Sequence, residues 1–181
     1  MKQLVTPVNN SDHISGNINA SLELVEYGDY ECPHCGRAYP IVKDIQQRLG
    51  PDMKFVFRNF PLSQIHPHAF SAAVAAEAAA LQDRFWEMHD LIFENQKNLE
   101  PENVLRLASI AGLNLEQFIN DIQRQTLHEK VRWDFESGIR SGVNGTPTFF
   151  VNGKKFNGNW SENELFKTLK SELASDAFST K

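Results

Sequence analysis

The sequence has few cysteines, no basic cluster and no long apolar run. Two cysteines among 181 residues exclude a fold held together by a network of disulfides. A formal net charge of −5, without any run of lysines or arginines, argues against nucleic-acid binding. No segment approaches the roughly 18 apolar residues of a membrane span, so we expect no stable membrane insertion. The composition, 41% hydrophobic with 13 phenylalanines, is that of a globular chain with a sizeable core.

The first twenty residues are polar. They contain Lys2 but no apolar stretch of about seven or more residues, which a secretory signal peptide requires. As written, the sequence therefore predicts a cytoplasmic protein. If a leader has been removed from it, a periplasmic or other extracytoplasmic location is expected instead.

Both cysteines lie in one Cys-Pro-His-Cys motif at residues 32–35. Such a pair is either a redox couple or half of a metal site. A structural zinc site needs two more ligands, and among the scattered histidines only His66 and His68 are close in sequence. These two precede a predicted helix, and we interpret them as solvated loop residues. We therefore favour a redox couple with no metal and no cofactor, and keep a zinc-binding module as an alternative.

The residues around the motif predict a strand followed by a helix. Residues 22–27 form a short, mostly apolar run that ends at Gly28, a turn signal. Apolar residues then recur at helical spacing from Tyr39 to Leu49, before Gly50 ends the pattern. Cys32 is therefore expected at the amino end of a helix.

This position gives the two thiols different roles. Free backbone N–H groups and the helix dipole favour a thiolate at Cys32, and Pro33 suits the first helical position. His34 adds partial positive charge and a hydrogen-bond donor beside the sulfur, which should lower the pKa of Cys32 and make the disulfide more oxidising. Cys35 lies one turn further in and is more shielded. We expect Cys32 to attack and Cys35 to resolve.

The rest of the chain predicts an α/β fold with a helical insertion. A strand at 53–60 should run parallel to the first strand, giving a right-handed βαβ unit. The segment that follows carries only helical patterns. These patterns lie at 69–81, 85–95, 101–111 and 115–125. After them we expect a helix at 127–141, strands at 148–151 and 154–156 joined by an Asn-Gly turn, and a last helix at 162–174. The predicted domains are 1–60 with 127–181, and an insertion at 61–126.

Thr146 and Pro147 stand just before the first of these late strands. A proline here marks an edge or a bend, and X-Pro is the bond for which the cis form costs least. From these residues alone, a trans proline that ends the loop is the simpler interpretation.

Taken together, these features resemble the DsbA-like branch of the thioredoxin superfamily. The resemblance rests on Glu26 six residues before Cys32, on the motif at 32–35, and on the sequence at 143–149 before the Asn-Gly turn. It covers nearly the whole chain, from about residue 21 to 174. It implies a thioredoxin fold with an inserted all-helical domain and the activity of a protein disulfide oxidoreductase.

The resemblance also implies roles for residues outside the motif. It places a cis Pro147 across from Cys32 and pairs the backbone of Thr146 with an extended substrate segment. It makes Glu26 a buried acid beneath the disulfide, where burial would raise its pKa and allow proton exchange with Cys35. The alternative is a surface glutamate on an edge strand.

The expected partners are protein thiols and disulfides, with glutathione or a separate recycling partner to regenerate the pair. The net reaction can run toward oxidation or reduction, and DsbA-like oxidants are typically exported. Two alternative functions remain. One is a glutathione-dependent transferase or isomerase of the same fold, although its members usually carry serine at the position of Cys32. The other is a redox-sensing or zinc-binding module.

Overall fold

A mixed five-stranded sheet forms the centre of the computed structural model, which describes residues 2–179. In spatial order the strands are β1 (His13–Gly16), β3 (Met53–Asn59), β2 (Leu22–Gly28), β4 (Thr148–Val151) and β5 (Lys154–Lys155). β2 and β3 are parallel, as the sequence predicted, and the other neighbouring pairs are antiparallel. The two parallel strands therefore lie inside the sheet.

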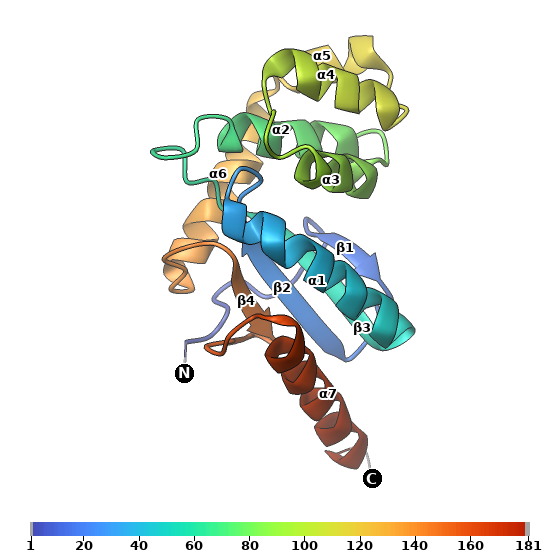
Figure 1. Ribbon diagram of the computed structural model, residues 1–181, viewed down its shortest axis with the longest axis vertical. Helices are drawn as coiled ribbons and strands as arrows, with labels where there is room; N and C mark the ends of the chain where they lie inside the picture. Colours follow the sequence, from blue (N-terminus) through green and yellow to red (C-terminus); the bar gives the residue numbers. More distant parts are fainter. Residues whose placement is uncertain (1, 180–181) are drawn as a thin grey trace.

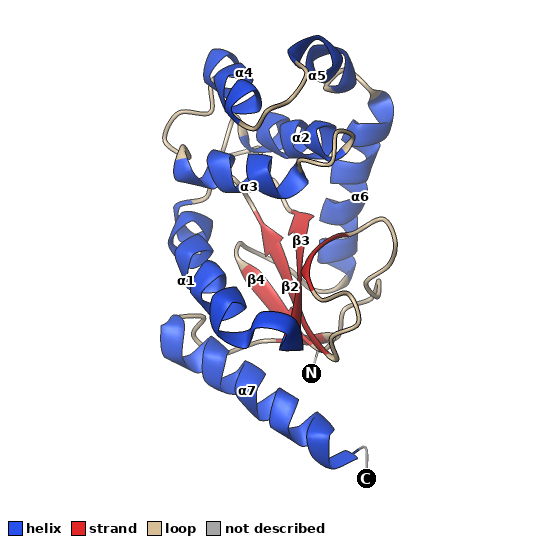
Figure 2. Ribbon diagram, turned by 90° about the vertical axis from the view of Figure 1, so that its right-hand side faces the viewer, coloured by secondary structure: helices blue, strands red, loops and turns tan. Residues whose placement is uncertain are grey.

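Helices cover both faces of the sheet and extend beyond one end. They are α1 (Pro33–Leu49), a short 3₁₀ helix (Gly50–Asp52), α2 (Ala69–Ala80), α3 (Phe85–Glu94), α4 (Pro101–Ile110), α5 (Leu115–Asp121), α6 (Gln125–Arg140) and α7 (Glu162–Ser179). Figure 1 shows α2 to α5 gathered at the top, past the end of the strands. In Figure 2, α1 and α7 lie on one side of the sheet and α6 runs along the other.

Alternation along the strands divides the core into two layers. Leu24 and Phe55 pack with the apolar face of α1, whereas Val25 and Tyr27 belong to the smaller cluster on the opposite face. Because successive side chains in a strand point to opposite faces, Glu26 shares the face of Leu24 and is directed toward α1. This register brings a carboxyl group beneath the helix that carries the cysteines.

The Asn-Gly turn is confirmed. Asn152 and Gly153 both have positive φ, 46° and 74°, as a tight two-residue hairpin turn requires. β5 ends at Lys155, one residue earlier than expected. The last helix continues past 174, to Ser179.

Two features differ from the sequence-based expectation. The expected helix at 115–125 ends at Asp121, because Arg124 has an extended backbone (φ −70°, ψ 122°) and starts α6 at Gln125. β1 was not predicted, since its short, polar sequence carries no strand pattern; it is held at the edge by antiparallel pairing with β3. Within the described residues, no helix is long and apolar enough to cross a membrane.

Candidate active site

Cys32 occupies the N-cap position of α1, with Pro33 as the first helical residue. Its backbone is extended (φ −71°, ψ 122°), as an N-cap requires. The carboxylate of Asp29 fixes the turn just before the helix: its Oδ1 accepts hydrogen bonds from the N–H groups of Glu31 (2.7 Å) and Cys32 (3.1 Å). The thiol of Cys32 is thus presented at the open end of the helix.

The surroundings of Cys32 favour its thiolate. Hydrogen bonds from the Cys35 side chain, then from Thr146 and the backbone N–H groups of Cys35 and His34, lower the pKa of Cys32 from its ordinary 9.0 to about 5, against an opposing effect of burial. Cys32 is only 4% exposed. A pKa near 5 favours the thiolate form of this sulfur at neutral pH.

The ring of His34 points to a different partner than the sequence suggested. Its Nδ1 accepts a hydrogen bond from Nη2 of Arg37 at 2.7 Å, on the exposed side of α1. What His34 supplies to the Cys32 sulfur is its backbone N–H. The contribution of the imidazole charge stays a prediction.

Cys35 and Glu26 lie behind Cys32 and are both buried. Burial raises the pKa of Cys35 well above its ordinary value. Burial, with a smaller contribution from the charge on Cys32, raises the pKa of Glu26 to about 8. Glu26 stands on a central strand and is 3% exposed, so the surface-glutamate interpretation is wrong. The buried carboxyl is well suited to exchange a proton near neutral pH.

The loop before β4 faces the cysteines. The Thr146–Pro147 peptide bond is cis, which corrects the trans proline read from the local sequence and agrees with the resemblance. The Cys32 thiol lies 3.5 Å from the carbonyl oxygen of Thr146. The hydroxyl of Thr148 donates to the carbonyl of Gly145 at 2.7 Å and so closes the turn of this loop.

Gln96, which the sequence analysis did not identify, lies just after α3 and holds the start of the motif by hydrogen bonds. Its Nε2 donates to the carbonyl oxygens of Tyr30 (2.9 Å) and Cys32 (2.8 Å). Gly36 leaves room for this contact, since a Cβ there would clash with Oε1 of Gln96. No local pattern marks a glutamine more than sixty residues away as part of the site.

His66 and His68 are not free loop residues. Oδ2 of Asp29 accepts a hydrogen bond from the N–H of Leu62 and contacts Nδ1 of His66, both at 2.8 Å. Glu31 binds the backbone N–H of His68 (2.7 Å) and contacts its Nδ1 (3.0 Å). The two histidines therefore tie the segment before α2 to the residues just before Cys32.

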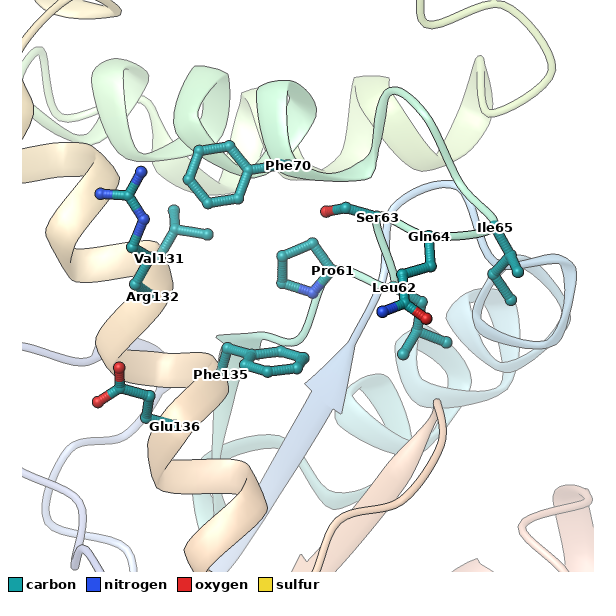
Figure 3. A pocket seen from close by; sticks show the side chains of 10 residues that line it. All are labelled: Pro61, Leu62, Ser63, Gln64, Ile65, Phe70, Val131, Arg132, Phe135 and Glu136. Carbon is teal, nitrogen blue, oxygen red and sulfur yellow. The ribbon is translucent and has the colours of Figure 1, made fainter.

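An open cavity of about 570 Å³ lies between this segment and α6 (Figure 3). The side chains of Pro61, Leu62, Phe70 and Phe135 point into it from the two sides, and Ile65 lies at its edge, 69% exposed. Leu62, which lines the cavity, donates its N–H to Asp29, three residues before Cys32.

A metal site finds no support in the described part of the chain. No group of three or more histidine, cysteine, aspartate or glutamate side chains is placed there to hold an ion. The two cysteines are present as free thiols.

The sequence pattern of the family described as thioredoxin matches residues 8–171. The fold is similar to a thioredoxin-like oxidoreductase from Silicibacter pomeroyi (25% identity, 92% of this chain and 94% of that chain, TM-score 0.82). BdbD from Bacillus subtilis is 27% identical, with 93% and 96% of the chains covered and a TM-score of 0.82. The thiol-disulfide exchange protein α-DsbA2 from Wolbachia pipientis is 21% identical, covers 91% and 88%, and also has a TM-score of 0.82.

Curated relatives of higher identity are much longer proteins. A Na⁺/H⁺ antiporter NhaA 1 of Mycolicibacterium gilvum is 43% identical over 171 residues, which are 92% of this chain and 28% of the antiporter. The chain thus spans about a quarter of the length of the curated relatives it matches.

Proposed function

We propose that Cys32 and Cys35 are a redox pair that exchanges disulfides with protein substrates. The chain belongs to the thioredoxin family and has the fold of its DsbA-like thiol-disulfide oxidoreductases. One arrangement carries the proposal: Cys32 stands at the N-cap of α1 beside the Thr146 carbonyl while Cys35 is fully buried, and accordingly the pKa of Cys32 is lowered to about 5 whereas that of Cys35 is raised. This asymmetry separates an attacking thiolate from a resolving thiol.

In the oxidising direction, a substrate thiolate attacks Cys32 of the Cys32–Cys35 disulfide. The bond between the two cysteines breaks, a mixed disulfide forms at Cys32, and Cys35 leaves as a thiolate that takes a proton from Glu26. A second substrate thiolate then attacks the substrate sulfur of the mixed disulfide. The substrate leaves with a disulfide, and Cys32 leaves as its stabilised thiolate.

In the reducing direction, the Cys32 thiolate attacks a substrate disulfide and one substrate sulfur leaves as a thiolate. Cys35 then gives its proton to ionised Glu26 and attacks Cys32. The second substrate thiolate is released, and the pair is left as a disulfide. A glutathione pool or a recycling protein would reset the pair in either direction.

Substrates are proposed to lie between the loop at Thr146 and the cavity beside Ile65. An extended segment would pair with the backbone of Thr146, which places its sulfur next to Cys32. Apolar side chains would then reach the cavity. We propose that the helical segment 61–126 acts as an inserted unit that supplies one wall of this region and the brace from Gln96.

The test of this function combines two variants. Cys32→Ser should abolish insulin reduction and RNase reoxidation, whereas Cys35→Ala should accumulate a covalent complex with substrate through Cys32. Equal activity in wild type and both variants would refute the assignment. Glutathione conjugation to a model electrophile, by wild type and by Cys35→Ala, separates the transferase alternative.

The direction and compartment follow from the reduction potential of the pair, measured in glutathione buffers. A potential well above that of the cytosolic glutathione pool would identify a disulfide donor for an oxidising compartment. A potential near or below it would identify a reductase. The ion exchange named for the antiporter relatives lies outside this proposal, because the chain matches only 28% of their length.

A further inference from the structure

The proposed function requires Glu26 to exchange protons with solvent, although it is buried. A second, small cavity of about 30 Å³ adjoins Glu26 and shares no lining residue with the 570 Å³ cavity. Its lining includes Glu26 from β2, Tyr39 and Lys43 from α1, and His89 and Asp90 from α3. About 10–15 Å³ of such space is enough for one water molecule, provided that polar partners line it.

Asp90 has one carboxylate oxygen that lacks a protein partner. Its Oδ2 accepts a hydrogen bond from Nζ of Lys43 at 2.7 Å, in an ion pair whose side chains are 28% and 48% exposed. Its Oδ1 is buried and has no hydrogen-bond partner among the described residues. Buried carboxylate oxygens are rarely left unpaired, and an ordered water commonly satisfies them. Asp90 therefore connects the cavity to the surface of the protein.

We propose that one water molecule in this cavity joins Glu26 to Asp90 and carries protons between the buried carboxyl and solvent. The inference rests on the proposed redox function, in which Glu26 serves Cys35. Asp90 touches neither cysteine nor substrate, and so acts through Glu26 as a positioning and relay residue.

The other ionisable groups at the cavity are less suited to this role. His89 is buried and neutral, with its pKa lowered to about 3 by burial and the nearby charges of Lys43 and His13, and its Nδ1 is in contact with the hydroxyl of Tyr30. The hydroxyl of Tyr39 donates to Glu94 at 3.2 Å, and its pKa is raised by burial and the adjacent Asp90 and Glu94. Lys43 is engaged with Oδ2 of Asp90.

The transfers balance in both directions of the proposed reaction. When Cys35 attacks the mixed disulfide, its thiol proton passes to ionised Glu26. Glu26 then gives a proton to the water molecule. The water in turn gives one of its own protons to Asp90, which releases it to solvent. When Cys35 leaves as a thiolate, Glu26 protonates it and is reprotonated along the same route. No electron moves along this route, and no further reactant is needed.

The first experiment is a crystal structure of the reduced full chain at a resolution that shows ordered water. We expect a water within hydrogen-bond distance of Oδ1 of Asp90 in the cavity beside Glu26. A dry cavity would overturn the relay while leaving the disulfide chemistry of Cys32 and Cys35 intact.

The second experiment measures the rate at which Cys35 resolves a preformed mixed disulfide at Cys32, in Asp90→Asn. We expect a slowing of about tenfold, less than the roughly 10²–10⁴-fold that general acid–base catalysis can contribute in all. The solvent deuterium isotope effect should rise, because proton delivery becomes limiting. The ultraviolet titration of the Cys32 thiolate should not change, since Asp90 does not act on that sulfur.

Two matched variants isolate the relay. Asp44→Asn makes the same change at an exposed carboxylate of α1 that pairs with Arg48, and should resolve at the wild-type rate. Lys43→Gln breaks the ion pair but keeps the carboxylate of Asp90, so its isotope effect should stay that of wild type. If Asp90→Asn resolves as fast as wild type, or if Lys43→Gln reproduces its isotope effect, the relay is refuted. Inactivity of the wild-type protein would instead refute the proposed function.

Discussion

The thiol of Cys32 lies 3.5 Å from the carbonyl oxygen of Thr146, although more than a hundred residues separate them in the sequence. Thr146 also helps to lower the pKa of Cys32. One loop therefore both tunes the sulfur and, in the proposed function, presents the substrate backbone to it.

Thr146→Val keeps the backbone carbonyl but removes the side-chain hydroxyl that helps to lower the pKa of Cys32, so it should raise that pKa by at most about one unit, which corresponds to about 1.4 kcal/mol. Titration of the thiolate absorbance measures the shift. Thr168→Val, on an exposed turn of α7, is the control and should leave the titration unchanged. No shift in Thr146→Val would assign the low pKa to the remaining donors.

Two substitutions at His34 separate its backbone from its ring. His34→Pro removes the N–H that stabilises the thiolate and should raise the pKa of Cys32 and make the pair more reducing. His34→Ala keeps the N–H and should titrate like wild type, since the ring is bonded to Arg37. If the alanine variant shifts as far as the proline variant, the imidazole charge is the cause, as the sequence first suggested.

Glu26→Gln should stabilise the protein increasingly as pH rises. The folded-state pKa of Glu26 is raised from 4.5 to about 8, so between these values the folded state binds more protons than the unfolded state. The free energy of unfolding of the wild type therefore falls as pH rises through this range, by up to about 1.4 kcal/mol per pH unit. Glu26→Gln has no carboxyl group at this position and escapes that loss. Urea unfolding of the reduced protein from pH 5 to 8 measures the difference.

The matched control for that series is Glu23→Gln. Glu23 stands on the same strand but is partly exposed and paired with Lys54 at 3.4 Å. It makes the same change at a partly exposed side chain and should show only a small difference from wild type. A gap between wild type and Glu26→Gln that is independent of pH would mean that Glu26 ionises as freely in the folded state as in the unfolded one.

Gln96→Ala should destabilise the protein by about 1–3 kcal/mol, because it removes two hydrogen bonds worth roughly 0.5–1.5 kcal/mol each. Hydrogen exchange at the start of α1 should quicken, and the reduction potential should change as the Cys32 backbone loosens. Gln82→Ala removes two similar contacts to Asn114 at the far end of the helical layer. It should cost stability without moving the potential; equal effects on the potential would remove Gln96 from the site.

Ile65→Asp should weaken turnover of apolar protein substrates several-fold while leaving exchange with small disulfides unchanged. Ile65 is 69% exposed at the edge of the larger cavity, so the substitution costs little stability. Ile110→Asp, 56% exposed at the end of α4, is the control for added surface charge. Loss of small-disulfide exchange in Ile65→Asp would show damage to the motif itself.

The sequence predicted those features whose cause is local. The helix through the cysteines, the parallel pair β2 and β3, and the Asn-Gly hairpin each follow from spacing, propensity or turn chemistry within a few residues. The boundary between α5 and α6 was not predicted, because the helical spacing of apolar residues continues across Arg124 whereas the backbone at Arg124 is extended and interrupts the helix.

The unpredicted parts depend on distant contacts. Strand β1 exists because β3 offers an edge to pair with, and Gln96 and His66 reach the site through the fold. Glu26 was named through a resemblance, and only the central position of β2 made it a buried acid.

The pairing of β2 with β4 has a consequence for synthesis on the ribosome. Glu26 lies opposite Phe149, so the strand that completes the sheet leaves the ribosome long after the cysteines do. Until then β2 presents an open edge, and the thiols of Cys32 and Cys35 lack the loop that faces them. The two thiols of a nascent chain are therefore open to exchange with other disulfides before the completed site can direct their reaction.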